Sequence, residues 1–565
     1  MSVWRHYLFI VVFIACAAAL SVRVVYLGVT ERDFLQEEGD RRSVYTKQLP
    51  AMRGMIYDRN GEALAVSTPV FAVAANPAQI ELGDSAKLRQ LAELLDLDFD
   101  ALMQSLESNR HRGFWYLKRH VSWERMDDIR RLKIPHISLE PEYRRYYPAG
   151  ESAAHVVGLT DIDDAGLEGV ELAFEKSLRG EPGTKTVLRD RLGRAIDDLE
   201  YGKAPQFGED IQLSIDSRLQ YLAYRELKAA VKSHGAESGS LVMVDVKTGE
   251  ILALVNQPSF NPNGSSNTRK PTRNRVVTDL YDPGSTIKPF TALAALETGR
   301  YRSDSQIETS PGYFWIDNKM IQDPINLNTI SLSQAIQKSS QVAIAKVALD
   351  LPEDAVFDVL QRSGIGDYVV TGMPGEVIGR FTNVGLQSRV SRAVMAYGYG
   401  FNVTPLQLAA AYVTLASHGN RLPLSILKTS RPVTPERVFA AADAREVVAM
   451  MEQVTERAGT ATKANIDYYR VAGKTGTARV LKQGAYDDES HIVWFAGLAP
   501  VSDPRIVMVV VVNEPQSGRA SGGQVAAPIF ARVAEHSLRL LGVMPDKNTG
   551  EAEGRSNLLL AERRL

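Results

Sequence analysis

The chain has 565 residues and a formal net charge of −2, and 44% of its residues are hydrophobic. This length accommodates two or three domains that each bury a core, and the near-neutral charge argues against a general polyanion-binding protein. The single cysteine, Cys16, excludes an intrachain disulfide, and the nine histidines form no ligand-spaced cluster, so we expect no metal and no organic cofactor.

The N-terminal segment predicts a membrane anchor. Residues 7–27 carry no charge apart from Arg23, and about 20 mainly apolar residues span a bilayer even with an arginine near one end. Arg5 in the leader, residues 1–6, favours a cytoplasmic N-terminus, which places the rest of the chain outside the cytoplasm. The small residues 17–19 also fit a cleavable signal peptide. Because the apolar stretch continues beyond them, we favour an uncleaved anchor.

The next two regions contain no combination of a nucleophile and a base. Residues 28–49 are charged and polar, which predicts a juxtamembrane stalk rather than a core. Residues 50–208 mix short strands, amphipathic helices and many arginines. Four charged residues of this region are more typical of structural pairs than of a reaction centre: Arg53, Asp58, Arg59 and Glu168.

Residues 209–542 alternate between helical and strand patterns. Strands at both ends, with helices between them, predict one sheet that is completed by distant segments. The expected elements are a helix over 217–233, a hairpin of 241–246 and 250–256, a strand pair of 491–499 and 505–513, and a helix over 526–541. The polar tail, residues 543–565, is expected to be mobile.

The string Ser285-Thr-Ile-Lys288 predicts a nucleophile beside its base. A helix places residues three apart on one face, and the preceding Asp282-Pro283-Gly284 is a turn signal, so we expect Ser285 at a helix start. Free backbone N–H groups there favour a developing oxyanion. Lys288 must be partly neutral to accept the serine proton, and burial beside a second cation lowers the pKa of a lysine.

A second string, Lys474-Thr475-Gly476-Thr477, supplies that cation through Lys474. We expect a strand over 468–480, where Gly476 lets a ligand backbone approach and a substrate pairs as an added strand. The N–H of Thr477 is the natural second oxyanion donor. The hydroxyl of Thr475 or Thr477 is expected to bind a carboxylate.

Each string alone also has an ordinary interpretation. SxxK occurs by chance in many chains, and a KTG tripeptide is often only a turn. A phosphate-binding loop ending at Thr475 requires a glycine where Tyr468 stands, and a helix where we expect a strand. The two strings in this order and context therefore favour serine acyl transfer.

Further motifs accompany the two strings in an order typical of one protein family. They are Arg53–Ala65, Arg145–Pro148, Gly166–Glu171, Tyr397–Gly400 and Trp494–Gly497. With them, the chain resembles the class B penicillin-binding proteins over nearly its whole length. The resemblance is greatest to the division-type, FtsI-like D,D-transpeptidases, which cross-link peptidoglycan.

The family's middle motif, SxN, is altered in this chain. In the family it contributes a serine for proton shuttling and an asparagine that holds a substrate amide. By order and context the matching residues are Ser339 and Gln341, because the literal match at Ser265-Ser266-Asn267 precedes the nucleophile. Gln341 keeps the amide but adds a methylene and rotamer freedom. We therefore expect a changed substrate or β-lactam selectivity; the alternative is that Gln341 simply adapts.

The resemblance implies an α/β (α+β) transpeptidase domain of the penicillin-binding and serine β-lactamase type over 209–542, with an antiparallel sheet flanked by helices. It implies a pedestal domain of the dimerisation type over 50–208. The implied site consists of the nucleophile Ser285, the base Lys288, the proton relay of Ser339 and Lys474, and the substrate-binding residues Thr475, Gly476, Thr477 and Gln341.

The implied ligands are stem pentapeptides ending in D-Ala-D-Ala, and β-lactams that imitate them. The implied partners are a membrane glycan polymerase and other division proteins, with no nucleic acid. We expect a single-pass protein of the bacterial inner membrane whose catalytic domain lies in the periplasm.

Three other functions remain open at this point. A β-lactamase shares SxxK and KTG, but no ExxLN-type segment follows Gln341 to supply a deacylating carboxylate. An elongation-type or condition-specific transpeptidase would use the same chemistry. A scaffold or β-lactam sensor would bind without turnover, and Gln341 gives this alternative some support.

Overall fold

The computed structural model describes residues 3–189, 195–264, 273–381, 388–430, 433–482, 485–516 and 520–547. The serine-rich match at 265–267 and the tail beyond residue 547 lie outside these residues. The chain forms two compact units that interleave along the sequence. Unit 1 contains residues 1–54, 67–144 and 179–209, and unit 2 contains residues 55–66, 145–178 and 210–565.

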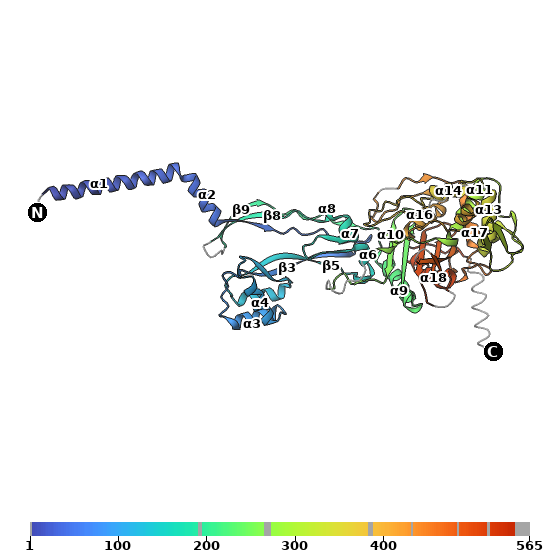
Figure 1. Cartoon of the computed structure of the whole chain (residues 1–565), viewed down its shortest axis with the longest axis horizontal. Helices are drawn as coiled ribbons and strands as arrows, with labels where there is room; N and C mark the ends of the chain where they lie inside the picture. Colours follow the sequence, from blue (N-terminus) through green and yellow to red (C-terminus); the bar gives the residue numbers. More distant parts are fainter. Residues whose placement is uncertain are drawn as a thin grey trace. The chain divides into compact units, whose positions relative to one another are not determined.

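The predicted anchor is helical. Helix α1 (Val3–Val25) continues into a π-helical turn, η1 (Tyr26–Thr30), and α2 (Arg32–Ser43) follows (Figure 1). Within the described residues, Val3–Thr30 is the one helix long and apolar enough to cross a membrane. The expected stalk ends in strand β1 (Val44–Leu49), which pairs with β8, so its last residues belong to a sheet.

Unit 1 contains an antiparallel sheet and a small helical core. The sheet has the strand order β1-β8-β9, with β8 at Gly183–Arg189 and β9 at Ala195–Lys203. The helices are α3 (Ser85–Leu94), α4 (Phe99–Ser108) and α5 (Trp123–Arg131). The carboxylates of Asp84 and Asp98 accept the backbone N–H of the third residue of α3 and α4, as N-caps do. Leu88, Leu91 and Leu106 are buried in the core of this unit.

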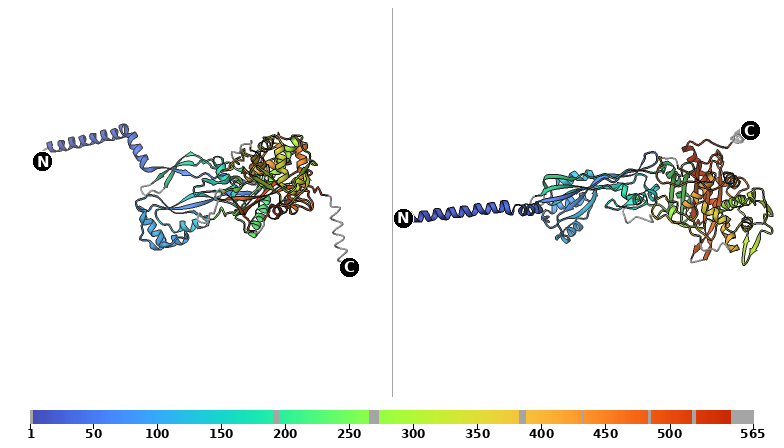
Figure 2. Two further views of the ribbon diagram at one scale, coloured as in Figure 1. Left: turned by 45° about the vertical axis from the view of Figure 1, so that its right-hand side comes forward. Right: turned by 90° about the horizontal axis from the view of Figure 1, so that it is seen from above.

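Unit 2 is built on a five-stranded antiparallel sheet. The strand pattern predicted one sheet made of distant segments, and the family resemblance implied that it is antiparallel. Its strand order is β12-β11-β21-β20-β19, so strands from both ends of the unit lie side by side (Figure 2). The strands are β11 (Ser238–Asp245), β12 (Ile251–Gln257), β19 (Ala472–Lys482), β20 (Ala485–Ala499) and β21 (Ile506–Asn513). Both predicted strand pairs are confirmed, whereas β19 begins at Ala472 rather than at Tyr468.

Helices cover the sheet of unit 2. Helices α9 (Ser217–Ser233) and α18 (Gly522–Leu540) contact each other and the sheet, and α16 (Pro405–Ala416) contacts β11, β20 and β21. Every residue of α16 except Ala410 is buried, which is typical of a core helix that is apolar on all sides. Helix α9 has the predicted bounds, and α18 begins earlier than the predicted Ala526, with Gly522, Gly523 and Val525 already buried.

The remaining helices of unit 2 are short or lie near the site described below. They are α6 (Ala154–Val157), α7 (Gly169–Ala173), α8 (Glu175–Leu178), α10 (Arg275–Thr278), α11 (Lys288–Glu297), α12 (Leu332–Lys338), α13 (Gln341–Asp350), α14 (Ala355–Arg362), α15 (Arg389–Ala396) and α17 (Ala441–Glu452), with 3-10 turns at η2 (Gly150–Ser152), η4 (Gly284–Ile287) and η5 (Thr462–Ala464). Short strands make two-stranded sheets: β6 (Leu159–Thr160) with β7 (Gly166–Glu168), β13 (Gln306–Glu308) with β16 (Thr329–Ser331), β14 (Tyr313–Ile316) with β15 (Lys319–Gln322), and β17 (Asn420–Arg421) with β18 (Glu436–Arg437).

Two stretches of the expected pedestal, residues 55–66 and 145–178, belong to unit 2. Ile56, Tyr147 and Val170 lie in the same hydrophobic core as Leu241 and Phe290. These stretches also contribute to a five-stranded sheet with the order β10-β2-β3-β4, in which β5 pairs with β3. Its strands are β2 (Ile56–Tyr57), β3 (Ala63–Ala75), β4 (Trp115–Val121), β5 (Ile137–Tyr146) and β10 (Ile211–Gln212). The two compact units therefore do not coincide with the consecutive domains that we expected from the sequence.

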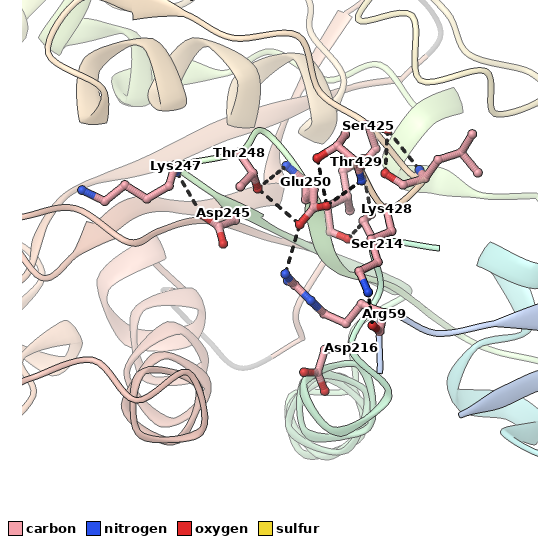
Figure 3. Close-up of polar contacts among 12 residues, drawn as sticks. Arg59, Ser214, Asp216, Asp245, Lys247, Thr248, Glu250, Ser425, Lys428 and Thr429 are labelled. Carbon is pink, nitrogen blue, oxygen red and sulfur yellow. Dashed lines mark hydrogen bonds and ion pairs between the residues drawn. The ribbon is translucent and has the colours of Figure 1, made fainter. Parts of the chain in front are cut away.

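Polar contacts attach the first of these stretches within unit 2. Arg59 donates to the Glu250 carboxylate at 3.0 Å, and the backbone and hydroxyl of Thr429 donate to its other oxygen at 2.8 and 3.1 Å (Figure 3). Asp58, fully buried, accepts hydrogen bonds from the backbone and hydroxyl of Ser217 at the start of α9. The structural charge pair expected of Arg59 is confirmed by its contact with Glu250, whereas Asp58 accepts its hydrogen bonds from neutral donors.

Candidate active site

Ser285 lies in the 3-10 turn η4, directly before helix α11, which begins at Lys288. A 3-10 turn has three residues per turn, so side chains at i and i+3 lie one above the other. Ser285 is half-buried and Lys288 is completely buried. Pro289 is in the first turn of α11, where its missing N–H costs nothing. Helical geometry therefore favours one side of the turn for both side chains, and their roles as nucleophile and base stay predictions.

Gly284 explains why the turn is so tight. Its φ is +54°, in the left-handed region that favours glycine, and its N–H donates to the carbonyl of Gly398 at 3.0 Å. A side chain on Gly398 would collide with the Gly284 carbonyl, at 1.9 Å from its Cβ. The Tyr397–Gly400 motif thus forms a support for the turn that carries Ser285.

Ser339 joins helices α12 and α13 in a strained conformation. Its φ is +59°, although it is not a glycine, and a left-handed residue of this kind costs about 1–2 kcal/mol. Ser340 then caps α13 by accepting the N–H of Ala343 at 2.9 Å. Surrounding contacts must hold such a residue in place, and strain of this kind is common at functional sites.

The amines of Lys288 and Lys474 both lie within hydrogen-bond distance of the Ser339 hydroxyl. Lys288 Nζ lies 3.1 Å from Ser339 Oγ and 2.5 Å from the Ser339 carbonyl, while Lys474 Nζ lies 2.9 Å from the same Oγ. Lys474 also donates to the carbonyl of Thr475 at 3.2 Å. Residues 288, 339 and 474 thus form one hydrogen-bonded cluster, although they are far apart in the sequence.

Burial makes both amines unusually acidic. Burial lowers the pKa of Lys288 to about 7. The Asp323 carboxylate has the opposite, smaller effect, because it favours the charged form of the lysine. Burial and the nearby Lys288 cation together lower the pKa of Lys474 well below its usual value. We expected a second cation to act on Lys288, but for that lysine burial is the dominant cause. Lys288 therefore titrates near neutral pH.

Strand β19 is the last strand of its sheet within the described residues, as expected for the KTG segment. We predicted that a ligand backbone would approach Gly476 closely. In the structure, a segment of the protein's own chain lies there instead. A Cβ on Gly476 would lie 2.9 Å from the Pro283 carbonyl and 2.9 Å from Thr286 Cγ2. This glycine therefore allows β19 to pack directly against the turn η4 that carries Ser285.

The substrate-binding candidates surround this cluster. Thr477 pairs with Val493 of β20, and its carbonyl accepts the Tyr399 hydroxyl at 3.4 Å. The hydroxyl of Thr475 is hydrogen-bonded to that of Thr460 at 3.0 Å. Gln341 is half-buried at the start of α13, and its backbone N–H donates to Asp323 at 2.6 Å.

Sequence reasoning did not find Thr460 or Asp323. Thr460 is a single hydroxyl in a loop, and Asp323 is a single carboxylate after β15. Neither belongs to a spaced motif, and no local pattern separates such residues from ordinary surface residues. Only their contacts with Thr475 and Gln341 reveal them.

Two family models match the chain. Residues 239–535 match the penicillin binding protein transpeptidase domain, and residues 48–213 match the penicillin-binding protein dimerisation domain. The chain is 43% identical over 553 residues to peptidoglycan D,D-transpeptidase FtsI of Escherichia coli K12, covering 97% of this chain and 93% of the relative. It is 40% identical over 535 residues to probable peptidoglycan D,D-transpeptidase PenA of Neisseria gonorrhoeae, covering 94% and 91%.

Solved structures support the same assignment. The transpeptidase domain of Burkholderia pseudomallei penicillin-binding protein 3 is 39% identical, with a TM-score of 0.55, over 60% of this chain and 98% of that one. Penicillin-binding protein 3 of Mycobacterium tuberculosis, complexed with aztreonam, is 25% identical, with a TM-score of 0.69, over 89% and 98%. The chain therefore belongs to the class B penicillin-binding proteins, as a peptidoglycan D,D-transpeptidase of the division-type FtsI family.

Proposed function

We propose that this serine transpeptidase cross-links peptidoglycan stem peptides during septal wall synthesis, through an acyl-enzyme on Ser285. The observation that carries the proposal is the shared Ser339 hydroxyl, 3.1 Å from the Lys288 amine and 2.9 Å from the Lys474 amine. Strand β19, which contains Lys474, packs on the turn that contains Ser285. These contacts support a site in which Ser285 is the nucleophile, Lys288, whose pKa is lowered to about 7, is the base, and Lys474 is the second amine.

Acylation begins with a stem peptide that ends in D-Ala-D-Ala and pairs along β19, with its carboxylate near Thr475 and Thr477. Ser285 Oγ attacks the penultimate carbonyl while neutral Lys288 takes its proton. The N–H groups of Ser285 and Thr477 hold the oxyanion of the tetrahedral intermediate. The C–N bond then breaks and leaves an ester on Ser285.

Ser339 and Lys474 deliver a proton to the departing D-Ala amine. The Ser339 hydroxyl suits this transfer because it lies within hydrogen-bond distance of both lysines. An amine from a neighbouring stem peptide then attacks the ester, which releases Ser285 and forms the cross-link. A β-lactam imitates the terminal dipeptide and stops the cycle at the acyl stage.

The cellular setting is proposed on the same basis. The helix Val3–Thr30 crosses the inner membrane once, with Arg5 on the cytoplasmic side and the catalytic unit in the periplasm. A membrane glycan polymerase and other division proteins are its partners. Depletion of the protein followed by imaging of cell shape tests the division role. Filaments support septal synthesis, whereas rounding points to elongation and normal shape to a condition-specific copy.

Labelling of the full chain with fluorescent penicillin tests the nucleophile. We expect covalent label on the native chain and none on Ser285→Ala. Turnover of pentapeptide-bearing glycan strands then separates an enzyme from a scaffold or sensor. Label without any cross-linked product would favour the sensor, and label that persists in Ser285→Ala would remove Ser285 from the mechanism.

A further inference from the structure

Asp323 is a nearly buried carboxylate that the mechanism above does not use. It follows strand β15, its exposed fraction is 9%, and its own N–H donates to the carbonyl of Gly312 at 2.9 Å. That backbone bond links Asp323 to the residue just before strand β14. The backbone of Asp323 is therefore fixed beside strand β14.

Three donors beside Ser339 converge on this carboxylate. Oδ2 accepts the Ser340 hydroxyl at 2.5 Å, and Oδ1 accepts the backbone N–H groups of Gln341 at 2.6 Å and of Val342 at 3.3 Å. The N–H groups are the first of helix α13, where the positive end of the helix dipole favours a negative charge. Asp323 thus binds the three residues that directly follow Ser339.

These contacts bear on the reacting groups through Ser339. The left-handed backbone of Ser339 needs support from its neighbours, and both its carbonyl and its hydroxyl accept hydrogen bonds from Lys288. A shift of Ser340 and Gln341 would move both acceptors. The Asp323 charge also acts on Lys288 directly, since it favours the ammonium form and opposes the effect of burial.

We propose that Asp323 is a positioning residue for acyl transfer, which holds the Ser339–Gln341 turn against Lys288 and Lys474 and sets the charge balance at Lys288. This inference rests on the proposed function of the site. It also extends to Gln341, because Asp323 fixes the backbone of the residue that replaces the family's asparagine. The alternative is that Asp323 is only a cap for helix α13.

Two substitutions separate geometry from charge. Asp323→Ala removes both. Asp323→Asn retains an acceptor for the two N–H groups but loses the charge, and its amide nitrogen must donate to the Ser340 hydroxyl instead of accepting from it. Asp350→Asn is the matched control, because Asp350 lies at the other end of α13 with a side chain that is 57% exposed.

The experiment measures the second-order acylation rate constant of the full-length protein with fluorescent penicillin between about pH 5 and 9, together with the thermal midpoint. We expect Asp323→Ala to slow acylation about 10- to 100-fold, as misplacement of reacting groups does. We expect Asp323→Asn to move the acid limb of the pH profile about one unit lower, because Lys288 then loses its proton more readily. The control should keep the native rate and profile.

Each outcome decides between the two roles of Asp323. If Asp323→Asn keeps the native pH profile, the charge role at Lys288 is overturned. If Asp323→Ala also folds and reacts at the native rate, the residue is only a helix cap and the whole proposal is overturned. If Asp323→Ala does not fold, the asparagine variant still decides the charge role. Failure of the native chain to react would overturn the proposed function itself, which distinguishes that result from a failure of the positioning role.

Discussion

Two sets of buried charged residues in unit 2 have different partners. Glu250, 2% exposed, faces Arg59, and the buried Arg145 faces Glu171 at 2.7 Å. Around Ser339, in contrast, the acceptors that the described part of the chain offers the completely buried Lys288 and Lys474 are one hydroxyl and two carbonyls. The two ion pairs match each cation with a carboxylate, whereas the Ser339 cluster brings two buried amines together at one hydroxyl.

The difference indicates what each set is for. A matched buried pair stays charged and contributes to the architecture, although its net stabilisation is small. Amines that are buried without such a match lose their protons, which costs stability but supplies a base. Both the Arg59 pair and the Ser339 cluster place basic side chains in a low-dielectric interior. The Arg59 pair contributes to the architecture, whereas the Ser339 cluster supplies a base.

The largest expected effect is the loss of the base in the Ser339 cluster. Lys288→Ala should lower the acylation rate constant about 10²- to 10⁴-fold, the usual contribution of general base catalysis. Stopped-flow or gel-based acylation with fluorescent penicillin measures it. Acylation near the native rate at neutral pH would remove Lys288 from this role.

A matched pair should respond through stability. Glu171→Gln leaves the Arg145 guanidinium buried without its carboxylate and should cost about 3–5 kcal/mol of unfolding free energy. Denaturant titration of the detergent-solubilised chain measures it. The control is Glu535→Gln in the exposed i,i+4 pair with Arg539, which should change stability by only about 0.5 kcal/mol. Equal losses in the two variants would contradict the distinction between buried and exposed pairs.

Removing the amine of a buried lysine that has no carboxylate partner among the described residues should raise the stability of the protein rather than lower it. Lys474→Met should stabilise the protein by on the order of 1–2 kcal/mol while abolishing turnover. Because the pKa of Lys474 is lowered on folding, the folded chain binds fewer protons than the unfolded chain, and native stability rises with pH. The gain should therefore shrink as pH approaches about 10, where the unfolded lysine also becomes neutral. A destabilised Met variant at neutral pH would show that the amine supports the fold.

The pH dependence of acylation should follow Lys288. With its pKa at about 7, the neutral base disappears as pH falls, so the rate constant should drop about tenfold per unit well below pH 7. The measurement is the acylation rate of the native chain across a buffer series. A rate that stays flat down to about pH 5 would place the acylation base elsewhere.

The smallest expected effect concerns selectivity. Gln341→Asn restores the family's residue and should change acylation rates by about two- to tenfold, unequally among β-lactams, which is the range of one hydrogen bond. Rate constants for several β-lactams on both proteins measure it. Identical rates throughout would mean that Gln341 simply adapts, since its backbone is held at 2.6 Å by Asp323 in either case.

Local patterns predicted much of this protein. The bounds of α9, the two strand pairs and the turn before Lys288 follow from contiguous residues, because periodicity and turn chemistry are properties of short segments. Motif order likewise indicated that residues 285, 288, 339 and 474 belong to one site, and Lys288, Ser339 and Lys474 are hydrogen-bonded together.

Tertiary structure decided the rest. Residues 55–66 and 145–178 share the core of unit 2 because their apolar side chains are buried there, which no division of the sequence into consecutive domains expresses. Asp323 and Thr460 join the site by contacts across 18 and 15 positions, and the space at Gly476 is filled by the chain's own turn. A lone carboxylate, hydroxyl or glycine has no periodicity of its own, so its role depends on which distant segment the fold places beside it.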